Sequence, residues 1–267
     1  MIRRLIAAAI LCAGFLCFPV VAQEKTANEK IDLAKISPEN FLSYVRRAPS
    51  KESWALMEGT ATHRRSGFRT IKSDIRFAVR FLPTRVTAQL RFNQNEYYNL
   101  GQTFAVPPVS TKMVHVKDPA NTELSKYGIE SSDLTLGFLY QDMLAEEKQE
   151  SVKGQNCRVF LMKSQVPGEI VRVFISTDYL FPLKAEWFKG DPQKDPKLKA
   201  YRNLEIDSVK KENDFWLITG LKLYGPDWRT MISFDKRLAG YPGDAAMPSD
   251  LFLLPPVIIS GKDKNNE

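Results

Sequence analysis

The strictest pattern in this sequence is a two-residue alternation over residues 71–82, and it constrains the fold more than any other feature. One side of this segment is apolar, and it consists of Ile75, Phe77, Val79 and Phe81. Side chains two residues apart lie on the same face of a β-strand, so the segment predicts a strand with one buried face. After a turn at Pro83 and Thr84 the alternation resumes over residues 85–92. The two segments predict a β-hairpin with one shared apolar face.

Further runs with strand character follow, separated by turn sequences rich in Gly, Pro, Asn and Asp. They lie at residues 96–100, 147–152, 156–163, 169–176, 183–188, 198–209, 215–224 and 228–234. Two short helices are also predicted, at residues 38–47 and at residues 133–140, each after serines that can cap a helix. About ten strands with hairpin-length connections predict one antiparallel sheet that must curl to bury its apolar face. We expect a mainly β fold, an open barrel, in one domain over residues 37–250.

The N-terminus has the features of a secretory signal peptide. Arg3 and Arg4 precede an apolar run that is too short to span a bilayer comfortably, and Ala22 completes a cleavage site. We predict a signal peptide over residues 1–22, cleaved after Ala22, and a flexible leader over residues 23–36. The alternative is an uncleaved membrane anchor. The mature chain keeps only Cys157, so no intramolecular disulfide can form, and a buried structural thiol is predicted.

The sequence offers little for catalysis. The chain has two histidines and three cysteines, and it contains no common hydrolase, metalloprotease or nucleotide-binding motif. His63 and His115 have no second ligand at metal-binding spacing, so we expect ordinary surface or hydrogen-bonded roles. The acidic run at residues 146–150 is predicted to be solvated, because neighbouring residues of a strand point to opposite faces. We therefore predict no enzymatic activity, no cofactor and no metal.

Positive charge is spread along the chain. The formal net charge of +7 falls to +5 when Arg3 and Arg4 leave with the signal peptide. Four arginines in the first hairpin are predicted to be solvated side chains, and they are Arg76, Arg80, Arg85 and Arg91. This scattered charge argues against nucleic-acid binding, whereas attraction to anionic lipid surfaces stays open.

The C-terminal tail over residues 251–267 begins with an apolar run that ends at Ile259. Pro255 and Pro256 interrupt this run and exclude a regular helix. We predict that the run packs across the sheet as an extended segment.

Motifs in the second half of the chain carry a family resemblance. They are Asp133-Leu-Thr-Leu-Gly-Phe-Leu-Tyr140, Ser151-Val-Lys-Gly-Gln-Asn-Cys157-Arg-Val, Val171-Arg-Val-Phe-Ile-Ser-Thr-Asp178 and Phe181-Pro-Leu-Lys-Ala-Glu186. In this order they resemble the outer-membrane lipoprotein-sorting protein family, relatives of the carrier LolA and the receptor LolB, although Arg158 replaces a frequent aromatic residue. The resemblance implies an open antiparallel half-barrel with helices across its mouth and an apolar cavity for lipoprotein acyl chains. It also implies a monomeric periplasmic carrier or receptor with sorting partners at the inner and outer membranes.

Twelve apolar residues are the candidates for lining this cavity. They are Ile75, Phe77, Val79, Phe81, Val86, Leu90, Phe92, Leu136, Phe138, Val173, Ile175 and Trp187. The helices at residues 38–47 and 133–140 are the candidate lids. A filled core has the same alternation as a cavity, so two other functions stay open. One is a module that binds free lipids, and the other is a non-enzymatic interaction scaffold with a filled barrel.

Overall fold

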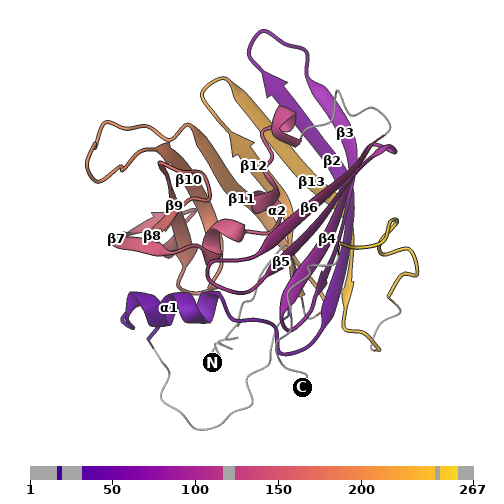
Figure 1. Ribbon diagram of the computed structural model, residues 1–267, viewed down its shortest axis with the longest axis horizontal. Helices are drawn as coiled ribbons and strands as arrows, with labels where there is room; N and C mark the ends of the chain where they lie inside the picture. The colour runs from indigo at the N-terminus through magenta and orange to yellow at the C-terminus, as the bar shows by residue number, and fades with distance from the viewer. Residues whose placement is uncertain (1–16, 20–31, 117–123, 214, 244–246, 258–267) are drawn as a thin grey trace, which may run out of the picture.

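A computed structural model describes residues 17–19, 32–116, 124–213, 215–243 and 247–257, and it shows one large antiparallel sheet (Figure 1). Thirteen strands take part, and twelve of them follow the order β6-β5-β4-β3-β2-β13-β12-β11-β10-β9-β8-β7. The short strand β1 lies off this path and pairs with β12. Strands β6 and β7 form the two edges, and no pairing between them occurs among the described residues. The predicted open half-barrel is therefore confirmed.

The strands have the following bounds: β1 (Cys17–Pro19), β2 (Ser53–Arg65), β3 (Ile71–Phe81), β4 (Arg85–Phe92), β5 (Glu96–Thr103), β6 (Ser110–Val116), β7 (Met143–Val152), β8 (Gln155–Lys163), β9 (Glu169–Ser176), β10 (Pro182–Lys189), β11 (Arg202–Glu212), β12 (Phe215–Tyr224) and β13 (Trp228–Gly240). The helical elements are the α-helices α1 (Pro38–Val45) and α2 (Ser131–Leu134) and the 3-10 helices η2 (Leu124–Tyr127) and η3 (Gly137–Tyr140).

The predicted first hairpin is confirmed as β3 and β4, which pair from Ile75 with Phe92 to Phe81 with Val86. Strand β6 was absent from the list of expected strands. Its residues 112–115 are exposed at the edge of the sheet, so they show no alternation of buried and exposed side chains. Edge strands of this kind leave little hydrophobic pattern in a sequence.

The first predicted helix is confirmed as α1. The Ser37 hydroxyl accepts a hydrogen bond from the Asn40 backbone N–H at 3.2 Å, and Pro38 lies in the first turn. The second predicted helix, at residues 133–140, is wrong as a single element. It consists of α2 and η3, which are separated at Leu136 by a left-handed backbone with φ of 40°. Thr135 and Gly137 are weak helix formers on either side of this break.

The topology explains why a segment covers the mouth of the half-barrel. Strands β2 to β6 run in order to one edge of the sheet, and β7 to β13 return from the other edge until β13 pairs with β2. The chain must therefore cross from the β6 edge to the β7 edge. Residues 124–141, which contain η2, α2 and η3, belong to this crossing and lie over the concave face (Figure 1). We call residues 124–141 the lid segment.

The tail crosses the convex face of β3, β4 and β5, and we call residues 248–257 the tail strap. Arg76 donates hydrogen bonds to the carbonyl oxygens of Leu251 at 2.9 Å and Asp250 at 2.6 Å. Further along, the Leu253 N–H donates to the Gln89 side chain at 2.8 Å, and the Asn99 side chain donates to the Pro255 carbonyl at 2.9 Å. The predicted packing across the sheet is confirmed up to Val257, but residues 249–254 form a turn and successive bends instead of an extended segment. Residues 258–259 lie outside the described part of the chain.

The expectation that Arg76 is solvated is wrong. Its side chain is 4% exposed because the tail strap covers it. The guanidinium lies between Glu58 and Asp250, with nitrogen–oxygen distances of 3.6 and 3.4 Å. A polar residue on the outer face of this sheet can therefore be buried by a distant segment.

Candidate functional site under the lid segment

The concave face brings all twelve predicted cavity residues together. Each belongs to one large buried cluster, and none is more than 5% exposed. Strands β3, β4, β9 and β10 supply ten of them, and the lid segment supplies Leu136 and Phe138. Their contact with a ligand stays a prediction, whereas their common position is established.

Side chains of the lid segment fill the space above this face. Tyr127 stacks on Phe92 with ring centroids 5.0 Å apart, and Phe138 meets Trp187 edge to face at 5.5 Å. Leu134 and Leu139 are 3% exposed. In this conformation the side chains of the lid segment are packed directly against the concave face of the sheet.

The end of α1 is tied to the lid segment by one side chain. Arg46 follows α1 and donates to the carbonyl oxygens of Leu139 at 2.6 Å and Gln141 at 2.7 Å. Phe41 of α1 stacks on Phe160 of β8 at 5.7 Å, which places the helix against the same concave face. The two predicted lid elements are therefore linked to each other.

A buried ion pair anchors the middle of the lid segment. Asp133 in α2 accepts a hydrogen bond from Arg202 of β11, and the two side chains are 0% and 7% exposed. The same Asp133 oxygen, Oδ2, accepts the Glu130 N–H at 2.7 Å, whereas Oδ1 has no hydrogen-bond partner among the described residues. Burial raises the pKa of Asp133 to about 6, although Arg202 acts in the opposite direction.

A polar contact also fixes the start of the lid segment. Thr230 of β13 donates to the Tyr127 carbonyl and lies 2.8 Å from His63 Nδ1. The predicted hydrogen-bonded role of His63 is thus confirmed, and His115 is exposed on β6. Gly128, the residue after η2, adopts a φ of +67°, and a β-carbon there would lie 2.1 Å from the Trp228 ring. Only glycine therefore allows the backbone to pass this close to Trp228.

Two of the acids expected to be solvated are paired instead. Glu146 binds the guanidinium of Arg158 through both oxygens, at 2.6 and 2.8 Å, and Arg158 is 3% exposed. Arg158 also donates to the Ile36 carbonyl at 2.9 Å, so it holds the chain just before α1. Glu147 points the other way and pairs with Arg172 at 2.6 Å. The expected orientation to opposite faces is confirmed, and the expected solvation of these two acids is wrong.

The remaining candidate groups have structural surroundings. Cys157 is a buried free thiol, as predicted, and burial raises its pKa to about 11. In the described part of the chain, no cluster of three or more His, Cys, Asp or Glu side chains is placed to hold a metal ion. Among the same residues, no helix combines the length and the apolar character needed to cross a membrane.

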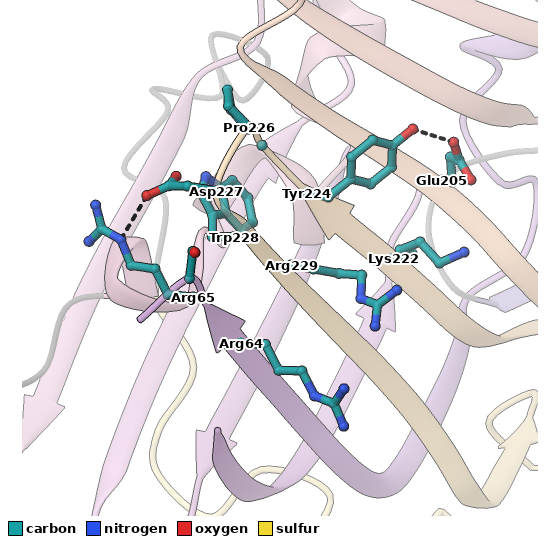
Figure 2. A pocket seen from close by; sticks show the side chains of 11 residues that line it. Arg64, Arg65, Glu205, Lys222, Tyr224, Pro226, Asp227, Trp228 and Arg229 are labelled. Atoms are coloured by element: carbon teal, nitrogen blue, oxygen red, sulfur yellow. Dashed lines mark hydrogen bonds and ion pairs between the residues drawn. The ribbon is translucent and has the colours of Figure 1, made fainter. Parts of the chain in front are cut away.

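A pocket of about 680 Å³ lies away from the concave face, at the turn between β12 and β13 (Figure 2). Its walls carry the charged side chains Arg64, Arg65, Glu205, Lys222, Asp227 and Arg229. The sequence reasoning did not find this pocket. The arginine pair at residues 64–65 was the available signal, but its counterpart Arg229 is distant in the chain.

Comparison with known proteins shows similarity of the fold to two solved structures. No protein-family model matches the sequence, and no curated protein does so at a significant level. A putative outer membrane lipoprotein-sorting protein domain from Vibrio parahaemolyticus matches with a TM-score of 0.57 and 11% identity, over 79% of this chain and 94% of that domain. A DUF1329 family protein from Desulfovibrio piger matches with a TM-score of 0.55 and 14% identity, over 78% of this chain and 92% of that one. The resemblance to the outer-membrane lipoprotein-sorting family is confirmed at the level of the fold.

Proposed function

We propose that this chain, which has the fold of a lipoprotein-sorting domain, is a periplasmic, non-enzymatic carrier or receptor for lipoprotein acyl chains. The observation that supports the proposal is the kind of structure that covers the concave face. A crossing segment of short helical turns, rather than a second sheet, lies on an apolar surface of β3, β4, β9 and β10. Such a cover can move while the sheet keeps its hydrogen bonds.

The lid segment presents apolar side chains to the sheet, as an acyl chain would present its methylene groups. Leu134, Leu136, Phe138 and Leu139 place apolar side chains where acyl methylenes would lie. Each buried methylene contributes about 0.8 kcal/mol, so an acyl chain can replace the apolar contacts that these side chains lose on opening. Exchange between lid segment and ligand therefore needs no net loss of buried apolar surface.

The polar anchors of the lid segment set the cost of opening. They are the contacts of Arg46 with Leu139 and Gln141, of Arg202 with Asp133, and of Thr230 with Tyr127. Hydrogen bonds of this kind contribute about 1 kcal/mol each and more when charged, and the freed groups can bind water after opening. The expected closed state is stable but can be opened by a ligand that buries several methylenes.

Secretion and cleavage after Ala22 belong to this proposal. Strand β1 precedes that cleavage site and pairs with Phe215, Trp216 and Leu217 of β12. Cleavage would remove β1, whereas every strand of the main path follows the site. The intact mass of the exported protein should correspond to a chain that begins at Gln23.

The test of acyl binding compares two matched substitutions in the mature protein. Phe138→Leu shortens a lid side chain at Trp187, whereas Phe188→Leu shortens a buried ring on the convex side of β10, where Arg172 lies 5.0 Å from the ring. Each should lower the free energy of unfolding by about 1 kcal/mol, since the side-chain volume changes little. Only Phe138→Leu should change the affinity for a fluorescent fatty-acid probe, and we expect tighter binding.

The filled interior also favours a second function, an interaction scaffold whose barrel never opens. Absence of probe binding in the wild type and in Phe138→Leu would support the scaffold and contradict the carrier. Mass spectrometry of ligand that co-purifies with the native protein separates the remaining choices. Lipoprotein supports the carrier proposal, and free lipid alone supports a general lipid-binding module.

A further inference from the structure

The pocket beside the β12–β13 turn opens on the convex face of the sheet (Figure 2). Arg64 of β2 and Arg229 of β13 lie on this face, because their neighbours His63 and Thr230 are buried on the opposite, concave face. Lys222 of β12 lies on the same surface, but its ammonium group is paired with Asp207 at 3.7 Å. The cations of the pocket thus face away from the surface under the lid segment, although the lining residue Trp228 packs against Gly128 of that segment.

The cations in this pocket are not balanced by its acids. Arg64 and Arg229 are directly opposite each other in the pairing of β2 with β13, an arrangement of like charges that destabilises a sheet. Of the two acids in the pocket, Asp227 pairs with Arg65 at 3.1 Å and Glu205 accepts the Tyr224 hydroxyl. Neither Arg64 nor Arg229 has an ion-pair partner among the described residues. An anion between the two guanidiniums would remove this repulsion.

An apolar tip stands next to these cations. Phe68, in the turn between β2 and β3, is 72% exposed, more than any other large hydrophobic side chain in the described part of the chain. Arg65 lies 5.7 Å from the Phe68 ring and also binds Asp227, so it connects the tip to the pocket. Residues 63–73 contain four Lys or Arg residues and no Asp or Glu. Ile71, at the start of β3, is a further 48% exposed apolar side chain.

From this juxtaposition we propose that the end of the half-barrel formed by the β2–β3 and β12–β13 turns is a docking surface for an anionic phospholipid membrane. Arg64 and Arg229 contact headgroup phosphates, and Phe68 enters the interfacial layer. The docking surface is independent of the acyl site and goes beyond the proposed carrier function, since it concerns the bilayer itself.

Two features favour a membrane over a soluble phosphate compound as the partner. A soluble anion would be bound by the cations alone and would give no role to Phe68, whereas a bilayer offers phosphates and an apolar layer side by side. The pocket is lined by residues of the β12–β13 turn, and Figure 1 shows this turn and the β2–β3 turn at the same end of the sheet. The positive charge of Arg64 and Arg229 and the exposed ring of Phe68 therefore both favour an anionic membrane as the partner.

The experiment is sedimentation of the mature protein with vesicles of phosphatidylcholine, with and without phosphatidylglycerol. We expect binding to the mixed vesicles that decreases with salt and little binding to phosphatidylcholine alone. Arg64→Gln with Arg229→Gln should weaken binding about 25-fold, since each basic residue near an anionic surface contributes about five-fold. Phe68→Ser should weaken it about ten-fold.

The controls remove one exposed charge and one exposed apolar side chain elsewhere on the surface. Lys194→Gln removes an exposed charge, with 85% of that side chain exposed, and Val166→Ser removes an apolar side chain that is 52% exposed. Both should bind vesicles like the wild type. Equal binding by the control and docking-surface variants would overturn the proposal. Binding of inorganic phosphate by the pocket, without any binding of vesicles, would also overturn it, because the site would then serve a soluble anion. Fatty-acid probe binding by the same variants reports separately on the carrier function.

Discussion

Removal of Arg202 should destabilise the protein by an amount that depends on pH. The guanidinium is the sole cation in contact with Asp133 among the described ion pairs, and the Asp133 side chain is fully buried. Loss of one partner of a buried pair typically costs about 3 to 5 kcal/mol, because the other charge stays uncompensated. In Arg202→Met, Asp133 can instead take up a proton, and its pKa of about 6 makes this cheap.

The magnitude follows from these two quantities. At pH 7, protonation of a group with a pKa near 6 costs about 1.4 kcal/mol. Arg202 also stacks over Trp187 at 4.2 Å and donates to the Gly128 carbonyl at 3.3 Å, and loss of these contacts adds about 1 to 2 kcal/mol. We expect a decrease of about 3 kcal/mol in the free energy of unfolding at pH 7. At pH 5 Asp133 is protonated already, so the decrease should be about half as large.

Urea denaturation of the wild type and Arg202→Met, followed by circular dichroism at both pH values, measures this difference. Arg172→Met is the control, since Arg172 pairs with Glu147 on the convex face at 2.6 Å and is 22% exposed. Its effect should not shrink between pH 7 and pH 5 in the same way. A loss in Arg202→Met that is below about 1 kcal/mol, or equal at the two pH values, would refute the reasoning.

Three further predictions concern Asp133, the tail strap and the thiol. Burial raises the pKa of Asp133 from 3.8 to about 6, so the folded state binds a proton that the unfolded state lacks between these values. Its contribution to the free energy of unfolding should therefore increase as pH falls from 6 to 4. Urea denaturation should show this increase for the wild type and not for Asp133→Asn. Equal pH profiles of the two proteins would contradict the prediction. Leu251→Ser, which removes a 3% exposed strap residue, should cost about 2 to 3 kcal/mol in thermal unfolding, whereas Leu253→Ser at a 36% exposed position should cost under about 0.5 kcal/mol, and similar losses would show that the strap is not packed as described. Burial raises the pKa of Cys157 to about 11, so a thiol reagent at neutral pH should label the mature chain only after unfolding, and rapid labelling of the native protein would refute its burial.

The sheet was predictable from the sequence wherever strand patterns are local. Strands β9 (Glu169–Ser176) and β12 (Phe215–Tyr224) have the predicted bounds, because alternation and flanking turns lie within about ten residues of chain. The inner face of β3 and β4 was identified for the same reason. Edge strand β6 and the break at Leu136 were missed, since burial at an edge and a left-handed residue leave no periodic signal.

Burial of charged side chains could not be predicted from local patterns. Arg76 was expected in water, and Arg202 was not singled out at all. Their partners Leu251 and Asp133 are 175 and 69 residues away in the chain. Only the completed fold brings such pairs together, so the anchors of the lid segment and the cationic pocket became visible in the structure alone.

The tail strap implies an order of events during folding. Its hydrogen bonds join residues that are 156 to 175 positions apart, and together they need side chains from all three of β3, β4 and β5. The tail strap can therefore pack against the sheet only after these three strands have paired, and contacts between residues so distant in the chain form slowly. Until then Trp54 and Ala78, which the strap residue Leu251 covers, stay open to water on the convex face. A chain that stops short of Leu251 would thus keep an apolar patch on the convex face. Burial of Trp54 therefore distinguishes a molecule whose tail strap has packed from one in which it has not.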